Sequence, residues 1–164
     1  MLQALVAWFE ATPLHEFVLD EAPWAWPLAE SLHFMGLTLL AGTITALDLR
    51  VLGVAKSIPP ILFHRLVPFG FLGLAVLIST GVMFLSGEPD QYIYNRAFYG
   101  KLILLVVSAL NAVFFYVKVY PALAQLPSGA DAARTAKLCA AVSLLALAGI
   151  MLCGRMLTFF RPLF

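Results

Sequence analysis

Residues 26–51 read WPLAESLHFMGLTLLAGTITALDLRV, an apolar stretch that is long enough to cross a bilayer as one helix. A membrane-spanning helix needs about 20 predominantly apolar residues. Near its start the stretch nevertheless carries a carboxylate, Glu30, and an imidazole, His33, one helical turn apart. Because ionisable groups are costly at membrane depth, this pair indicates a functional site within the membrane.

Three further apolar stretches follow, separated by polar, turn-rich segments. The predicted spans cover residues 26–51, 61–85, 97–120 and 134–160. Pro68 lies inside the second of them and is expected to bend it. The third is expected to stop at Pro121, because proline lacks a backbone N–H and its ring disfavours a continuing helix.

The composition agrees with a membrane protein that has no second domain. Hydrophobic residues make up 62% of the 164 residues and charged residues 12%, and the mean hydropathy is +0.94. Soluble domains are about half apolar and about a quarter charged. We therefore predict an all-α fold, an integral membrane four-helix bundle over residues 24–164, with a short interfacial helical segment before it.

That N-terminal segment, residues 1–23, contains short amphipathic patterns rather than a span. Thr12 followed by Pro13 is typical of an N-cap and the first helical position. The acidic residues of the segment have no Lys or Arg beside them, so it lacks the basic region of a signal peptide and is expected to remain in the mature protein. We expect it to lie at the membrane surface, with the tryptophans at headgroup level.

The distribution of basic residues predicts the orientation. Six Lys or Arg residues flank the first and third loops, against four at the opposite ends of the spans, and cytoplasmic loops carry the excess of such residues. The four are Arg96, Lys101, Arg155 and Arg161. Both termini are therefore predicted to be periplasmic in a bacterial inner membrane.

Other classes of function find no support in the sequence. The net charge is +1 and the basic residues form no dense cluster, which argues against nucleic acid as a partner and leaves membrane lipid. Cys139 and Cys153 lie fourteen positions apart on one predicted helix, so they cannot form a disulfide and are read as packing residues. No nucleotide-binding, metalloprotease or serine-hydrolase motif is present.

Polar residues on several spans are predicted to meet in the outer half of the bundle. On the first span a stripe at steps of three and four is expected to face inward, as are shorter stripes on the third and fourth spans. The first stripe is Glu30, His33, Gly36, Leu40, Thr43 and Leu47, the third-span stripe is Lys101, Ser108 and Ala112, and the fourth-span stripe is Ala141, Ala148, Met151 and Arg155. Met83, near the end of the second span, is predicted to lie in the same layer, and Asn111 is a further polar candidate inside the third span.

This set of side chains suits haem b. His33 would be the axial ligand and the metal-binding residue, Lys101 and Arg155 would hold the propionates, and Met83 or Met156 would be a sixth ligand. Glu30 would orient His33. His64 begins the second span about 20 Å away along the membrane normal, too far to bind the same haem, and is expected to be a solvated flank.

Simpler interpretations stay open beside this one. Glu30 can pair with Lys101 or Arg155 for structural reasons, the two cations can extend to lipid headgroups, and methionines usually fill space. The same side chains would also suit a proton path or a transient copper site.

Several segments carry a resemblance to known families. Residues 30–33, 48–53, 95–98 and 154–156, with Gly42, Lys101 and Asn111, resemble an uncharacterised group of small bacterial four-helix inner-membrane proteins. More distantly, the early histidine and the later lysine resemble the copper-resistance protein D family and the HemJ-type protoporphyrinogen oxidases. The latter resemblance implies that His33 serves haem binding and that Lys101 is needed for activity.

The leading hypothesis is a haem b-binding electron-transfer protein that links the quinone pool and a membrane partner. The alternatives are a non-catalytic subunit or anchor of a larger complex and a small proton or copper transporter. Whether the protein is an enzyme, or forms a homo-oligomer, is left open by the sequence.

Overall fold

The computed structural model describes residues 1–160, and of these it describes all side chains except those of Asp20 and Glu21. Arg161, which entered the orientation argument, and the last residues of the predicted bundle lie outside this range. The described residues form helices and turns with no strand, and four helices are long and apolar enough to cross a membrane. The predicted all-α, multi-pass four-helix fold is confirmed.

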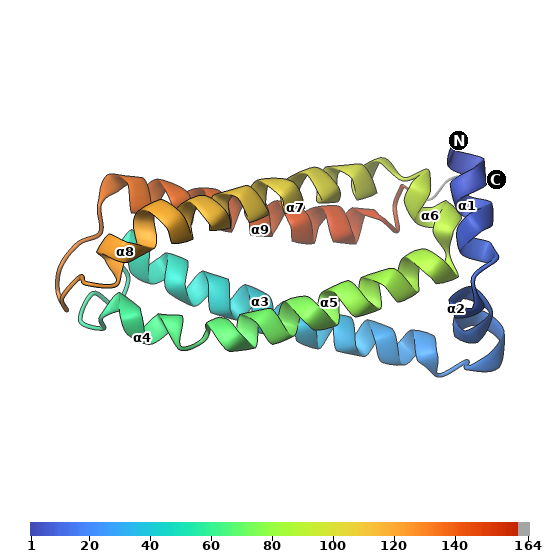
Figure 1. The fold of residues 1–164 in the computed structure, drawn as a ribbon, viewed down its shortest axis with the longest axis horizontal. Helices are drawn as coiled ribbons and strands as arrows, with labels where there is room; N and C mark the ends of the chain where they lie inside the picture. The colour runs from blue at the N-terminus through green and yellow to red at the C-terminus, as the bar shows by residue number, and fades with distance from the viewer. Residues whose placement is uncertain (161–164) are drawn as a thin grey trace.

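The four spans run in alternating directions as two hairpins (Figure 1). The first hairpin joins α3 (Ala25–Leu52) to α4 (Pro60–His64) and α5 (Val67–Gly87). The second joins α7 (Arg96–Phe114), the π-helical turn η2 (Phe115–Val119) and α8 (Tyr120–Leu123) to α9 (Arg134–Met156). Helix α3 packs along α5, α7 packs along α9, and contacts between α3 and α9 hold the hairpins together.

Proline positions explain where the spans differ from the prediction. The second span is interrupted at residues 65–66, and Pro68 is in the first turn of α5, where its missing N–H is not needed. The third span does not stop at Pro121, because the wider turn η2 precedes it and Pro121 lies in the first turn of α8. Both prolines therefore start helices instead of bending or ending them.

Two glycines allow α3 and α5 to cross closely. A Cβ atom added to Gly73 would lie 2.6 Å from the carbonyl oxygen of Gly36, and one added to Gly36 would lie 2.9 Å from the carbonyl oxygen of Gly73. Such a crossing brings the two backbones into direct contact, which is how small residues favour helix association in lipid. It holds the first hairpin together at its centre.

The N-terminal segment packs across one end of the bundle (Figure 1). It contains α1 (Leu2–Glu10), α2 (Pro13–Glu16) and η1 (Phe17–Glu21), and it contacts α5 and the short α6 (Pro89–Ile93). The predicted cap is confirmed, since the hydroxyl oxygen of Thr12 accepts a hydrogen bond from the backbone N–H of His15. His15 Nδ1 donates in turn to the carbonyl oxygen of Ser86 at 2.7 Å, which fixes the segment to the end of α5.

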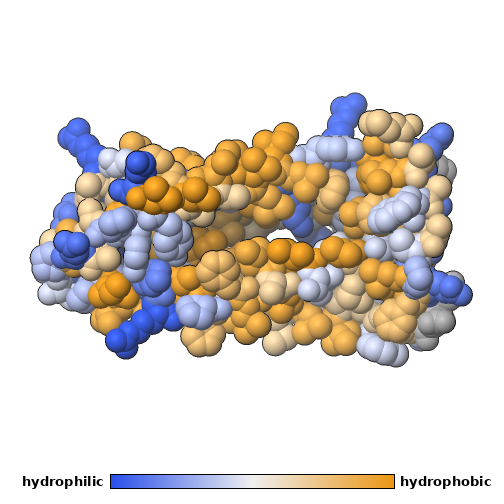
Figure 2. All heavy atoms as spheres, in the orientation of Figure 1, coloured by the Kyte–Doolittle hydropathy of each residue, from blue (hydrophilic) through white to orange (hydrophobic). Residues whose placement is uncertain are grey.

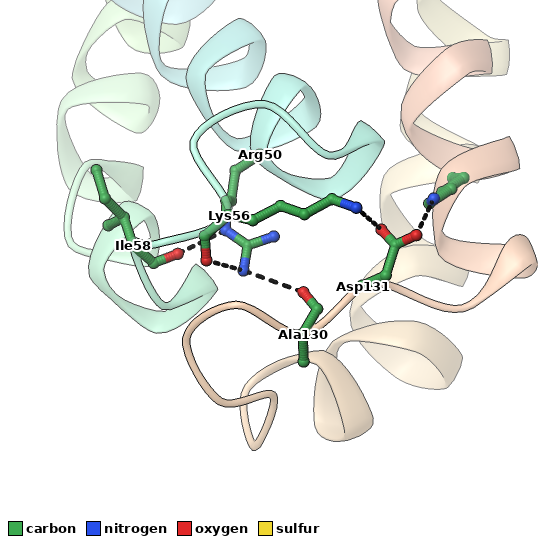
Figure 3. A network of polar contacts seen from close by, with 6 residues as sticks. Arg50, Lys56, Ile58, Ala130 and Asp131 are labelled. Carbon is green, nitrogen blue, oxygen red and sulfur yellow. Dashed lines mark hydrogen bonds and ion pairs between the residues drawn. The ribbon is translucent and has the colours of Figure 1, made fainter.

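At the opposite end, a set of polar contacts that we term the loop network joins the first and third inter-span loops (Figure 3). The side chain of Arg50 is 1% exposed. Its guanidinium donates to three carbonyl oxygens, of Ile58 at 2.5 Å, Lys56 at 3.2 Å and Ala130 at 3.5 Å. Asp131 completes the loop network by binding the ammonium groups of Lys56 at 3.3 Å and Lys137 at 2.7 Å.

The main hydrophobic core lies at the same end as the loop network. It is formed by the last turns of α3, by η2 and α8, and by the first turns of α9. Its members include Leu47, Val51, Phe115, Val119, Ala136 and Ala140. These contacts join the two hairpins at the end away from the termini, which we call the loop end.

Candidate functional site

The imidazole of His33 has a fixed hydrogen-bonding arrangement. Its Nδ1 lies 2.7 Å from the hydroxyl oxygen of Thr80 on α5, and that hydroxyl also lies 2.7 Å from the carbonyl oxygen of Val76. The carbonyl oxygen can only accept, so the single hydroxyl proton is donated to it, and the hydrogen between His33 and Thr80 belongs to Nδ1. The Nε2 atom of a neutral His33 therefore keeps a free lone pair, the form in which imidazole binds a metal.

The surroundings of His33 are those of a helix contact rather than of a lipid-facing side chain. The imidazole is half-buried, and its ring lies 5.3 Å from the ring of Phe84 on α5. Thr80 is only 3% exposed. Helix α5 thus orients His33 through one hydrogen bond and one aromatic contact.

Lys101 reaches the same layer from the second hairpin. Its ammonium is close enough to His33 and to Cys153 on α9 for electrostatic interactions with both. Lys101 is half-buried, and among residues 1–160 it has neither an ion pair nor a hydrogen bond. A half-buried cation at membrane depth that has no counter-ion in the described chain is a candidate partner for an anionic group.

The space between the hairpins is hollowed at this level. Figure 2 shows a gap between the α7 and α9 pair and the α3 and α5 pair, with hydrophilic atoms visible inside it and apolar atoms around it. Since α3 and α7 start, and α5 and α9 end, at the same end of the bundle, Glu30, His33, Met83, Lys101 and Arg155 lie in one half of it. These side chains come from facing helices, which is how helical bundles build ligand sites, so this half of the bundle is the candidate site.

Glu30 does not have the position predicted for it. Its side chain is exposed, and its Oε1 accepts a hydrogen bond from the indole Nε1 of Trp26 at 3.2 Å. His33 Nδ1–H donates its hydrogen bond to the hydroxyl oxygen of Thr80 instead. The orienting role that the sequence assigned to Glu30 therefore belongs to Thr80.

Arg155 and Met83 lie at the margins of the site. Arg155 is exposed near the end of α9, with its guanidinium carbon 5.8 Å from the centre of the Phe159 ring. Met83 is half-buried on α5, one turn from Thr80. The predicted inward stripe on α9 is wrong, because Ala148, Met151 and Arg155 are exposed; its buried residues are Ala136, Cys139, Ala140 and Ala146.

Asn111 connects two helices rather than contributing to the site. Its Nδ2 donates to the carbonyl oxygen of Cys139 at 3.1 Å, which ties α7 to α9. It is ten residues from Lys101, about 15 Å along the helix. The prediction that Asn111 belongs to the cofactor site is therefore wrong, because its amide already binds a backbone carbonyl in another layer.

His64 is packed against aromatic residues rather than surrounded by solvent. Its ring lies 4.6 Å from that of Tyr120 and 5.9 Å from that of Tyr116. These three rings form an aromatic group at the loop end, in the other half of the bundle from His33.

The described part of the chain contains no group of three or more His, Cys, Asp or Glu side chains that could hold a metal ion. Both cysteines are free, as their spacing predicted. A metal that needs a full set of protein ligands is therefore not accommodated by these residues. A metal that brings most of its own ligands needs only one or two from the protein.

Two important residues were not found from the sequence. Thr80 stands in an otherwise apolar run, and only its pairing with His33 across the helix contact reveals its role. Arg50 was counted as one of the basic residues that flank the first loop and as part of the resemblance over residues 48–53, whereas it is buried and holds the loop network. The signal available in the sequence was the position of Arg50 shortly before Gly53, the glycine in the left-handed conformation that ends α3.

A sequence model described as "Family of unknown function (DUF6644)" matches residues 24–160. The chain belongs to DUF6644. The DUF6644 match covers all four spans and every candidate site residue, and it begins where the N-terminal segment ends. No curated protein and no solved structure matches this DUF6644 chain.

Proposed function

We propose that this DUF6644 protein binds haem b between its two hairpins and transfers electrons within the membrane. The observation that carries the proposal is the arrangement of His33, whose Nδ1–H is held by Thr80 so that Nε2 is free. Lys101, a half-buried ammonium without a carboxylate partner in the described chain, lies near the same imidazole.

These residues fit the demands of a porphyrin. The macrocycle supplies four nitrogen ligands, so one histidine is sufficient to attach it, and its propionates need cationic partners. His33 would bind the iron through Nε2, and Lys101 would hold a propionate. Bound haem b would supply one-electron exchange between its ferric and ferrous states.

The protein's own residues set the conditions for that exchange. Thr80 fixes the orientation of the imidazole and increases its basicity through the hydrogen bond to Nδ1. Phe84 excludes water from one side of the ring. We place the site in the periplasmic half of a bacterial inner membrane, with the quinone pool and a membrane redox protein as electron partners.

Visible absorption of the purified protein tests this proposal. Expressed with an adequate haem supply, the protein is expected to show a Soret band and, after reduction, an alpha band. His33→Ala is expected to abolish both, while His64→Ala, at the other end of the bundle, is expected to retain them. Circular dichroism checks that each variant remains helical.

A colourless wild-type protein with normal helicity would reject haem binding. Retention of both bands in His33→Ala would reject His33 as the ligand. In the first case, co-purification of a partner tests the subunit alternative, and proton or copper flux into liposomes tests the transporter alternative.

A further inference from the structure

Asp48 is a buried carboxyl group that the candidate site does not use. It lies on α3, four residues before the helix ends at Leu52, which is about 6 Å along the axis. Asp48 is only 6% exposed, and its Oδ2 is buried and has no hydrogen-bond partner in the described chain. His33 is fifteen positions away, about 22 Å along the same helix, so the two groups belong to different parts of the bundle.

The surroundings of Asp48 provide a polar partner but no counter-ion. Ser143 on α9 interacts with the carboxyl group, and Cys139, one turn earlier on α9, lies near it. Leu47 and Val51, on either side of Asp48 in α3, belong to the hydrophobic core at the loop end. Within residues 1–160, no Lys, Arg or His forms an ion pair with Asp48.

The other charged and titratable groups at this end have different partners. Arg50, two residues further along α3, donates to the carbonyl oxygens of the loop network, and its Nη1 makes no ion pair with Asp48. The two lysines of the loop network bind Asp131. His64 on α4 packs on the ring of Tyr120 on α8. None of these groups supplies Asp48 with a counter-ion.

An ionised carboxylate would not be compensated in this position. Burying a charge without a paired opposite charge is so costly that such groups become neutral instead. A hard metal cation needs several oxygen ligands, whereas the polar partners here are a hydroxyl and a thiol. A proton needs no further ligand, because the un-ionised carboxyl group can donate to the oxygen of Ser143 and leave Oδ2 as a neutral carbonyl oxygen.

We propose that Asp48 is a proton-binding site, which holds a proton while α3 and α9 are packed together and releases it when they part at the loop end. On binding, a carboxyl oxygen forms an O–H bond to a proton taken from water on the loop side. On release, the proton returns to that water and leaves a solvated carboxylate. Because contacts between α3 and α9 hold the two hairpins together, the bound proton stabilises this joint. The inference does not depend on haem binding.

Infrared spectroscopy of the purified protein in detergent at pH 7 tests the proposal. Exposed carboxyl groups are ionised at this pH, so a carbonyl band of an un-ionised carboxylic acid is expected from the buried group. Asp48→Asn is expected to abolish the band. Glu30→Gln, which changes an exposed carboxyl group in the other half of the bundle, is expected to retain it. Ser143→Ala is expected to shift its wavenumber, because the carboxyl group loses its partner.

The pH dependence of unfolding in detergent is a second readout. Unfolding exposes Asp48 to water, where the acid ionises, so the wild type releases a proton on unfolding that Asp48→Asn does not release. A reaction that releases a proton becomes more favourable as the pH rises. Between pH 5 and pH 7, the folded-to-unfolded ratio of the wild type should therefore fall by up to about tenfold per pH unit relative to Asp48→Asn.

Three results would overturn the proposal: no such band in the wild type, a band that persists in Asp48→Asn, or the same pH dependence in both proteins. If the wild type lacks the band and is stabilised by Na⁺ but not by choline, the ligand is a metal cation instead of a proton. Should Asp48→Asn fail to fold, the wild-type band and its shift in Ser143→Ala decide. His33→Ala is expected to keep the band, which separates this proposal from haem binding.

Discussion

At the scale of single residues, the candidate site depends on Thr80, which would not itself bind the metal but orients the residue that does. Thr80 gives its only proton to a backbone carbonyl within α5, so its oxygen is left as an acceptor for His33. This makes the tautomer of the imidazole a consequence of helix geometry. Such outer hydrogen-bond partners commonly matter to metal affinity almost as much as the ligands.

Thr80→Val keeps the shape of the side chain and removes the acceptor. We predict that it weakens haem binding about 10- to 100-fold, as is typical for the loss of an outer-shell hydrogen bond. The measurement is titration of apo-protein with haem followed by the Soret band. Ser79→Ala is the matched control, because Ser79 is adjacent, exposed and bonded only to its own helix. Equal affinity of Thr80→Val and wild type would remove Thr80 from the site.

Lys101→Met tests the role of the unpaired ammonium. Methionine keeps the length and apolar stem of the side chain but removes the charge. We expect haem to bind about 10-fold more weakly, which corresponds to the loss of one charge-assisted hydrogen bond. Lys118→Met, on the exposed side of η2, serves as the control. If both variants behave alike, the ammonium of Lys101 does not contact a propionate.

At the scale of helices, the crossing of α3 and α5 has almost no tolerance for added atoms. Gly73→Ala would place its Cβ 2.6 Å from the carbonyl oxygen of Gly36 and 2.8 Å from the amide nitrogen of Leu40. Both are backbone atoms of α3, so the helices must separate. We predict a loss of about 1–3 kcal/mol in stability, measured by thermal or denaturant unfolding in detergent.

Gly81→Ala on the same helix is the contrasting variant. Nothing lies within 4 Å of a Cβ added there, so alanine only improves helix propensity. It is expected to leave the protein unchanged or slightly more stable. Equal destabilisation by both substitutions would show that the crossing is looser than the structure indicates.

The loop network predicts a pH dependence of stability. Hydrogen bonds from Lys137 and Lys56 hold the pKa of Asp131 below its ordinary value of 3.8. A lowered folded-state pKa means that the contribution to stability is present above 3.8 and is lost as the pH falls through the folded-state value. Asp131→Asn should therefore lower the melting temperature slightly at pH 7, and this difference from wild type should shrink as the pH falls below 3.8.

The same measurement in high salt provides a check. Because Asp131 and its partners are partly exposed, salt should reduce the difference between Asp131→Asn and wild type. A difference that stays constant as the pH falls from 7 to well below 3.8 would mean that the carboxylate charge is not what stabilises the loops.

The helices themselves were largely predictable, because membrane depth requires long apolar runs and each run is visible in the sequence. The interruptions were not, since Pro68 and Pro121 can either bend a helix or start one. The choice depends on the residues before them: a break at residues 65–66 in one case and the π turn η2 in the other.

The site was only half predictable for a similar reason. His33 and Lys101 stand out as polar residues in apolar runs, whereas the partners of Glu30, Thr80 and Asn111 depend on how the helices rotate against one another.

At the scale of the whole molecule, the first and third loops lie at one end, and both ends of the described chain lie at the other with α6 (Figure 1). The excess of Lys and Arg at the loop end leads us to predict that this end is cytoplasmic. A cysteine introduced at Ser128 should react with a membrane-impermeant maleimide only after cells are opened, and one introduced at Gln3 should react in intact cells. The wild type, with its two cysteines on α9, gives the background. The opposite labelling pattern would invert the orientation.

The hydrophobic cluster at the loop end holds the two hairpins together, while a gap opens between them along the side of the bundle (Figure 2). If haem binds as proposed, it can enter between the two hairpins after the polypeptide has been inserted into the membrane, without any helix having to unwind. Assembly in this order would let cells that lack haem accumulate an intact, protease-resistant apoprotein, which binds haem once the supply returns.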